Sequence, residues 1–214
     1  MSMEYTWQFD FVWKYRDVLL GGIQGTYVLT LWTTFFSTIA ALIVSLFSIS
    51  SIRFLRYSAI VYVETFRAIP TLVGLVWVYY SLPVLTNISL PGSISAIIGL
   101  TLCRACYLAE VFRAGIESID KGQMEAARAI GMSYPQAMRR IILPQAVRKM
   151  IPPFMNQFAM ILKYTSMASV LAVTEILHEA NDVIQHTFRP LEVYTLVAIL
   201  YFVLIFPVAR LSRF

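Results

Sequence analysis

The stretch GQMEAARAIGMSYPQAMRRIILP, from Gly122 to Pro144, is charged and helix-prone, and it interrupts a chain that is otherwise apolar. Of 214 residues, 58% are hydrophobic and only 14% are charged, and the mean hydropathy is +0.69. A soluble domain carries about 25% charged residues. The charges are too few to cover a soluble core of this length, so the composition predicts a polytopic membrane protein with a polar segment in its middle.

The apolar runs predict an all-α fold with five transmembrane helices in a single transmembrane domain, residues 1–214. Each run reaches or approaches the ~20 residues that a ~30 Å hydrocarbon core requires. Lipid offers no partner to backbone N–H and C=O groups, so spans of this length should be helices rather than the ~10-residue strands of a barrel. The expected spans are about 21–48, 57–82, 94–116, 150–173 and 193–209. Pro70 should kink the second span, and its end is expected in a turn that begins near Leu82.

Lysine and arginine gather in three of the segments that join or follow the spans. They lie at 53–56, 121–149 and 210–213, which five spans place on one side of the membrane. The loop 82–93 has no charge, and the loop 174–192 is acidic. Positively charged loops stay in the cytoplasm, so we expect the N-terminus outside and both the C-terminus and the polar segment in the cytoplasm. The net charge of +5 reflects these loops, and no basic patch with interleaved aromatic residues indicates nucleic acid.

The polar segment, about 120–144, predicts two short helices joined at a glycine. Asp120 is placed to cap the first helix, and Gly131 can adopt the left-handed conformation that stops it. Ser133 has capping-box spacing to a glutamine, and Pro144 is expected to end the second helix. Physics alone leaves two interpretations open: a lever that a partner protein grips, or a surface loop whose apolar side rests on lipid headgroups.

Several motifs resemble those of permease subunits in bacterial ATP-binding-cassette importers of the polar amino-acid uptake family (histidine, glutamate, glutamine or arginine type). The run Glu125-Ala126-Ala127, then Gly131 and Leu143-Pro144, resembles the EAA loop of that family. Stretches that resemble its second, third and fourth spans are ETFRAIPTL (64–72), CYLAEVFRAGIESIDKGQMEAA (106–127) and LKYTSMASVLAVTEI (162–176). The resemblance covers about residues 21–209. Tyr164 is a departure, because family members often have an acidic residue there.

The resemblance implies a type I importer permease fold in the bacterial plasma (inner) membrane. In the family, the EAA loop forms a coupling helix that docks on an ATPase subunit. Partners implied are a second permease chain (identical or homologous), two ATP-binding subunits, an extracytoplasmic solute-binding protein and membrane lipid. The docking residues implied are Glu125, Ala126, Ala127, Arg128, Ile130, Gly131, Met132 and Ser133.

The chain itself has no phosphate-binding loop of the form G-x-x-x-x-G-K-[ST]. ATP and magnesium are therefore expected on the partner ATPase subunits, and this chain is expected to be a transport subunit rather than an enzyme, with no catalytic residue, cofactor or metal of its own. Cys103 and Cys106 form a C-x-x-C inside an apolar run, and without nearby ligands we expect two small buried hydrophobic residues.

Charged residues within the spans mark the expected substrate pathway, since a charge at a helix centre costs ~2.5–3.5 kcal/mol on insertion scales. Arg104 and Lys163 lie at comparable mid-depth and suggest a site for the α-carboxylate of an amino acid. The alternative is that either cation pairs with Glu64 or Glu110. Glu64 could instead pair with Arg67 on one helix face. The pathway residues expected are Lys163, Arg104, Tyr107, Gln157, Thr165, Ser166, Glu64 and Arg67.

The substrate expected is a polar or charged amino acid, with a weak preference for an acidic one because cations are in excess. A rival is a stand-alone secondary transporter or channel that uses the intramembrane charges. That rival predicts an internal inverted repeat, whereas five spans cannot divide evenly and no repeat is visible. A membrane enzyme would need a nucleophile and base, and no such set is visible.

Overall fold

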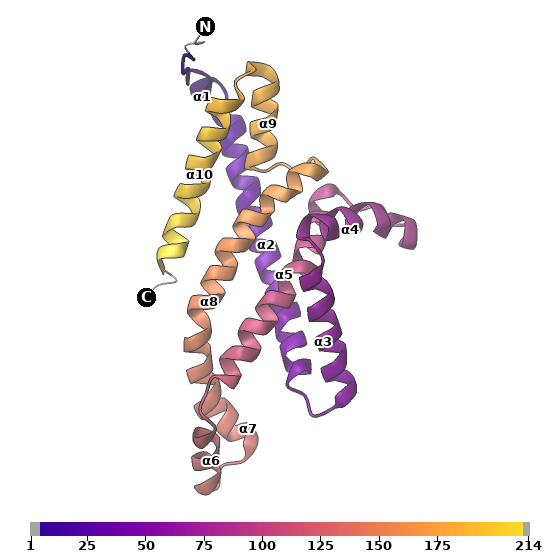
Figure 1. Ribbon diagram of the computed structural model, residues 1–214, viewed down its shortest axis with the longest axis vertical. Coiled ribbons are helices and arrows are strands. Elements are labelled where there is room, and N and C mark those ends of the chain that lie inside the picture. Colours follow the sequence, from indigo (N-terminus) through magenta and orange to yellow (C-terminus); the bar gives the residue numbers. More distant parts are fainter. Residues whose placement is uncertain (1–4, 212–214) are drawn as a thin grey trace.

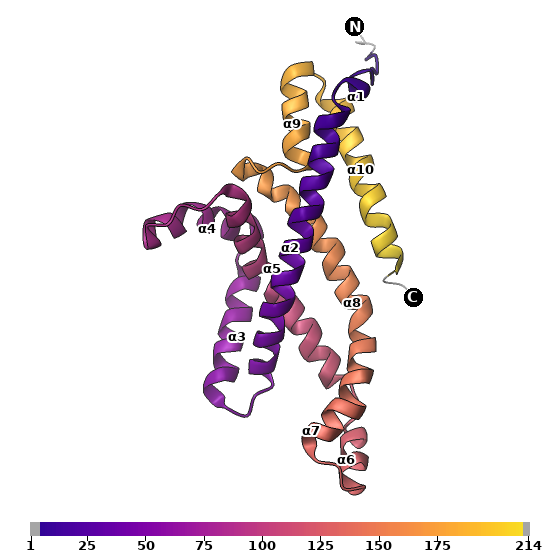
Figure 2. The same cartoon turned by 180° about the vertical axis from the view of Figure 1, so that it is seen from behind.

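The computed structural model describes residues 5–211, and all regular elements within that range are helical. They are α1 (Phe11–Lys14), α2 (Arg16–Ser48), α3 (Arg53–Ala68), α4 (Thr71–Thr86), α5 (Gly92–Glu117), α6 (Lys121–Ala129), α7 (Tyr134–Ala137), the π-helix η1 (Met138–Ile142), α8 (Leu143–Tyr164), the 3₁₀-helix η2 (Thr165–Leu171), α9 (Ile176–Thr187) and α10 (Pro190–Leu211). Figure 1 shows an elongated bundle with α6 and α7 at one end and α1 and α9 at the other. From behind, α3 and α4 lie on one side of α2 and α10 on the other (Figure 2).

Three helices, α2, α5 and α10, are long and apolar enough to cross a membrane. Two bent pairs bring the number of candidate spans to five: α3 with α4, and the segment from α7 to η2 with α9. The predicted spans 21–48, 94–116 and 193–209 lie within the three long helices. The chain is thus an integral membrane protein by the length and composition of its helices.

The second predicted span is broken rather than kinked. The axes of α3 and α4 differ by 104° at the break between them. Ile69 is extended (ψ 128°) and Pro70 follows it, as expected because proline disfavours the helical conformation of the preceding residue. The predicted turn at Leu82 is wrong: α4 continues past Pro83 to Thr86 and ends at Asn87 in the left-handed region (φ 57°).

Helix α5 lies at the centre of the packing. Its Ala105 is fully buried against Ala41 of α2, and such small residues let transmembrane helices approach closely. On its other side, a Cβ atom added at Gly99 would lie 3.0 Å from the Cα atom of Leu75 in α4. By contrast, α3 buries only Ala59 and Val63 of its 16 residues. The bundle therefore has a tightly packed centre, and α3 is joined to it by few buried side chains and by the hydrogen bond from the Tyr62 hydroxyl to the Leu102 carbonyl (2.7 Å).

The polar segment forms the predicted pair of short helices around a glycine. The Asp120 carboxylate accepts from the backbone N–H of Gly122 (2.7 Å), as the predicted N-cap of α6. Gly131 has a φ of +84°, and the backbone bonds Met132 N–Ala127 O (3.1 Å) and Gly131 N–Arg128 O (3.0 Å) close a Schellman motif. These bonds satisfy the last carbonyls of α6 and fix where the chain turns.

The capping box at Ser133 is confirmed, with Gln136 Oε1 accepting from the Ser133 N–H (3.0 Å). The expected stop at Pro144 is wrong, because α7 continues through η1 into α8 without a break. The π-turn immediately before α8 provides the reason: its wider spacing leaves room for a proline ring that would otherwise clash with a carbonyl four residues back. The fourth span is therefore continuous with the polar segment.

The expected acidic loop 174–192 is instead the helix α9, packed on α2 and α10. Glu175 is fully buried and caps α9, accepting from the N–H groups of Leu177 (2.9 Å) and His178 (2.6 Å) and from the Tyr201 hydroxyl (3.1 Å). Glu192 is also fully buried and accepts from the Arg189 guanidinium (3.0 Å) and the Tyr5 hydroxyl, a contact that raises the pKa of Tyr5. Two of the acidic groups thus hold this end together.

Candidate functional site

Arg104 is an enclosed cation in the middle of α5. It is 4% exposed, and its Nη2 donates to Thr71 Oγ1 on α4 (3.0 Å). Its guanidinium carbon lies 4.3 Å from the ring centre of Tyr107 and 4.2 Å from that of Tyr164 on α8. Its buried Nε has no hydrogen-bond partner within residues 5–211. Stacking between two rings stabilises a desolvated guanidinium by about 2 kcal/mol or more, and the Nε remains available as a donor.

The stack extends to a second arginine. Arg67 on α3 also lies over the ring of Tyr107, with 5.9 Å between the guanidinium carbon and the ring centre. The order Tyr164, Arg104, Tyr107, Arg67 thus runs from α8 through α5 to α3. Three helices that are far apart in the sequence, α3, α5 and α8, are joined here by a row of cations and aromatic rings.

A groove between α5 and α8 begins beside this stack. Its volume is about 500 Å³, and its lining includes Tyr107, Arg67, Glu110, Gln157 and Lys149. Lys149 also donates to the Ser118 carbonyl at the end of α5 (2.8 Å). The groove therefore offers polar side chains from the level of Tyr107 to the end of the bundle that carries α6.

Lys163 lies elsewhere. It is exposed in a groove of about 540 Å³ between α8 and α10, which it lines with Ser166 and Tyr201 among others, and Arg104 is not part of that lining. Lys163 and Tyr164 are consecutive in α8, so their side chains point about 100° apart. The structure thus separates the two cations that the sequence places at equal depth. Thr165 is buried and donates to the Leu162 carbonyl (2.7 Å).

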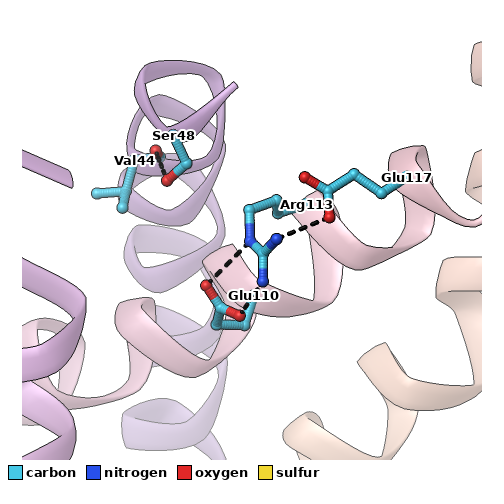
Figure 3. A network of polar contacts seen from close by, with 5 residues as sticks. All are labelled: Val44, Ser48, Glu110, Arg113 and Glu117. Carbon is cyan, nitrogen blue, oxygen red and sulfur yellow. Dashed lines mark hydrogen bonds and ion pairs between the residues drawn. The ribbon is translucent and has the colours of Figure 1, made fainter. Parts of the chain in front are cut away.

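The expected ion pairs are rearranged. Glu110 pairs with Arg113 (2.7 Å), which also binds Glu117 (2.7 Å), so neither Arg104 nor Lys163 takes Glu110 as an ionic partner. Figure 3 shows the Arg113 guanidinium between the two carboxylates, beside the end of α2. No ion pair within 4.0 Å joins Glu64 to Arg67.

These charges line a separate cavity. The cavity measures about 450 Å³ and is bordered by α2, α3 and α5; we call it the charged cavity, and its lining is Ser48, Arg56, Ile60, Val63, Glu64, Arg67, Glu110, Arg113 and Glu117. It reaches from the last residue of α2 to the end of α3. Cys103 and Cys106 lie outside it and are free and buried, as expected.

The expected docking residues lie at the tip of the molecule, on α6 and the turn after it. Ile130 is 77% exposed, and a side chain added at Gly131 would meet nothing within 4 Å. Glu125, Ala126, Arg128 and Ser133 are exposed, Met132 is half-buried and Ala127 is buried. An exposed isoleucine beside small residues gives this tip an apolar surface that a partner can contact closely.

Sequence reasoning missed three contributors to these sites: Thr71, Tyr164 and Tyr201. Thr71 follows the Pro70 break, and only the fold brings it to Arg104. Tyr164 was noticed as a departure from the resembled motif, and its position after Lys163 was the available signal. Tyr201 comes from α10, and no sequence pattern links it to Lys163.

Residues 34–214 match the family described as the binding-protein-dependent transport system inner membrane component. The chain belongs to this family. The family is one of transport-system membrane components, in agreement with the predicted permease, and the match covers most of the membrane-spanning part.

Relatives of this inner membrane component are named as amino-acid permeases. A probable amino-acid permease protein of Bacillus subtilis (strain 168), YxeN, is 38% identical over 93% of this chain and 90% of its own length. The probable glutamine ABC transporter permease protein GlnP of the same organism is 34% identical over 95% of this chain and 96% of its own. The L-cystine transport system permease protein TcyB of the same strain is 38% identical over 90% of this chain and 82% of its own.

Solved structures share the fold. A crystal structure of an amino acid ABC transporter with histidines has a TM-score of 0.91 and 31% identity, over 98% of this chain and 97% of that one. An inward facing MetNI methionine ABC transporter has a TM-score of 0.75 and 23% identity, over 94% of this chain and 97% of that one, a likeness of fold alone. The fold is therefore that of importer permeases.

Proposed function

We propose that this chain is the membrane subunit of an ATP-driven amino-acid importer in a bacterial inner membrane. Relatives at 34–38% identity over nine-tenths of the chain are named for amino-acid, glutamine and cystine transport, which supports the substrate class. Five spans, with the N-terminus outside, agree with the placement of lysine and arginine. In that orientation, the end with α6 and α7 is cytoplasmic and the end with α1 and α9 is outside.

The observation that carries the proposal is the enclosed Arg104. The guanidinium held between Tyr107 and Tyr164 keeps one buried donor unpaired, and a carboxylate that reached this donor would form a charge-assisted hydrogen bond with it. Arg67 stands next in the row and has no carboxylate within 4.0 Å in the described part of the chain. The excess of cations supports a polar or charged amino acid and favours an acidic one. Lys163, in its own groove, is a second point on the pathway.

The α6–α7 tip is proposed to dock on an ATPase subunit. It has an exposed apolar residue, Ile130, and a glycine turn whose geometry is fixed by the Schellman bonds. It is also continuous with α8 through η1, so a push on the tip is carried to the helix that holds Tyr164 and Lys163. ATP and magnesium would be held by two such ATPase subunits.

A second permease chain, identical or homologous, is proposed to complete the pathway. A solute-binding protein would deliver substrate at the α9 end.

The proposal is tested by reconstituting the chain in liposomes with its ATPase and solute-binding partners. Uptake of a labelled amino acid is expected only with ATP and with the ATPase present. Uptake that continues after the ATPase is omitted would contradict the proposal. Competition by unlabelled amino acids then identifies the substrate, and the strongest competition is expected from glutamate or aspartate.

Coupling is tested at the hinge. Gly131→Val places a β-branched residue at a φ of +84°, which costs about 1–2 kcal/mol and should reopen the turn. ATP hydrolysis is expected to continue while uptake per ATP hydrolysed falls at least severalfold. Ala129→Val, at an exposed helical position of α6, is the comparison for adding a valine. An unchanged ratio in Gly131→Val would count against docking at this tip.

A further inference from the structure

The charged cavity has two walls whose net charges are opposite. We define the α3 wall by Arg56, Glu64 and Arg67, and the α5 wall by Glu110, Arg113 and Glu117. The α3 wall has two guanidinium groups and one carboxylate. The α5 wall has one guanidinium and two carboxylates. The walls therefore attract each other across the cavity, and the attraction is strong where water is displaced.

The α5 wall is ordered by its own arginine. Arg113 donates to both oxygens of Glu110 (3.2 and 2.7 Å) and to Glu117 (2.7 Å). One guanidinium shared by two carboxylates leaves a negative charge unmatched on this wall (Figure 3). The wall is thus a prearranged acceptor of a second cation.

The α3 wall lacks such an arrangement. Within residues 5–211, no ion pair within 4.0 Å involves Arg56, Glu64 or Arg67. Arg67 instead contacts the ring of Tyr107 at 5.9 Å, near the outer limit for a cation–π contact. This wall therefore holds cations that no carboxylate neutralises at 4.0 Å or less in the described part of the chain.

Helix α3 is tied to α5 through the Tyr62 hydroxyl, which donates to the Leu102 carbonyl (2.7 Å), and has few other buried side chains. It buries only Ala59 and Val63, and the 104° break at Ile69–Pro70 separates it from α4. Its other end joins α2 through the short non-helical stretch 49–52. Two breaks and few buried side chains give α3 a hinge at each end.

Arg67 and Glu110 also lie where the charged cavity meets the α5–α8 groove. Both line the charged cavity, and both line the α5–α8 groove that contains Tyr107 and Gln157. Helices α3 and α5 run in opposite directions (Figure 1), so the order from Arg56 to Arg67 along α3 runs against the order from Glu110 to Glu117 along α5. Closure of the walls would therefore seal the passage between groove and cavity at two levels.

We propose that the two walls form the cytoplasmic gate of the pathway, closed by Arg67 engaging Glu110 and Arg56 engaging Glu117. The structure holds the gate open. The inference rests on the proposed importer function, since it assigns the cavity to the cytoplasmic side. Glu110 keeps one oxygen on Arg113 when the gate closes, so the α5 wall serves as the fixed half and α3 as the moving half.

The gate is tested by exchanging its charges. In the reconstituted complex, R67E and E110R are each expected to reduce ATP-driven uptake at least tenfold and to let preloaded amino acid leak out. The double variant R67E/E110R is expected to recover a third or more of the uptake and to stop the leak. R53E, on the same helix but outside the cavity lining, controls for the added negative charge. Single variants with full uptake, or a double variant that stays as inactive as the singles, would overturn the gate.

A second measurement does not depend on transport or on charge-reversed chains. Ile60→Cys on α3 with Ala114→Cys on α5 leaves all six wall charges in place. In a Cys103→Ala/Cys106→Ala background, this pair is crosslinked with a short bifunctional thiol reagent in the purified complex. The crosslinking rate is expected to rise at least severalfold when ATP is trapped on the ATPase, and an unchanged or lower rate overturns the proposal. Lack of ATP-driven uptake by the unaltered chain would count against the importer function instead, so the two failures are distinguishable.

Discussion

Helices α5 and α3 both carry charge into the membrane, yet they are held in opposite ways. Arg104 on α5 is enclosed by Thr71, Tyr107 and Tyr164 from three helices. Arg67 on α3 has one distant ring contact and lies on a helix with two buried residues. The difference teaches that burial, rather than depth in the membrane, distinguishes the proposed binding frame from the proposed moving wall. The frame consists of α2, α4, α5, α8 and α9, and α3 lies beside it.

The largest loss of stability is expected where the backbone of α2 packs closely against the backbone just before α9. A Cβ atom at Gly25 of α2 would lie 2.1 Å from the Thr174 carbonyl oxygen. Because backbone atoms cannot give way locally, Gly25→Ala should displace α9 and cost about 3 kcal/mol or more, measured as a lower Tm of the purified protein. Gly21→Ala is the control, since nothing lies within 4 Å of its Cβ position. Equal Tm values for the two variants would show that α9 is not locked to α2.

The second effect concerns the enclosed cation. Arg104→Lys keeps the charge but loses the planar stack between two rings and the geometry of the bond to Thr71. Stability should fall by about 2 kcal/mol, and the KM for uptake should rise at least tenfold. Lys163→Met removes the other mid-span cation from an open groove, so its Tm should change less. An unaltered KM in Arg104→Lys would show that the carboxylate of the substrate does not bind at Arg104.

The smallest effect is expected from Val63→Ala on α3, and Leu100→Ala on α5 is its reference for a fully buried position. Leu100→Ala empties a fully buried position on α5 and should cost about 2–5 kcal/mol. Val63→Ala removes the equivalent of two methylene groups from α3, and about 1.6 kcal/mol or less is expected. Thermal unfolding in the same detergent compares them. If Val63→Ala lowers the Tm as much as Leu100→Ala, α3 belongs to the frame and cannot be the moving wall.

Local signals predicted the local structure well. Hydropathy located α2, α5 and α10, and capping residues located α6, Gly131 and α7, because these features depend on neighbours in the chain. Pro70 was expected to kink its helix, yet the 104° break depends on the packing of α4 against α5. The prediction that the helix ends at Pro144 was wrong because a π-turn, which residue types do not reveal, accommodates the proline. The segment 174–192 was predicted to be a loop because the sequence does not show that Glu175 and Glu192 accept hydrogen bonds from Tyr201 and Tyr5.

The residues of the candidate site could be predicted from the sequence, but their arrangement in space could not. Arg104, Tyr107 and Lys163 stand out as polar groups at mid-depth. Their separation follows from the direction of Tyr164 relative to Lys163 and from which helices flank α8, and only the tertiary structure determines that. The pairing of Arg113 with Glu110 and Glu117 could be read from spacing alone, whereas the unpaired state of Arg67 could not.

The most direct test of the division between frame and wall is a pair of distances measured in the complex by pulsed electron paramagnetic resonance. Spin labels at Ser58→Cys on α3 and Ser118→Cys at the end of α5, in the cysteine-free background, report the moving pair. Labels at Leu46→Cys on α2 and Ser118→Cys report the frame. On trapping ATP, the α3–α5 distance should shorten while the α2–α5 distance stays the same. An unchanged α3–α5 distance, or an equal change in both, would contradict the account.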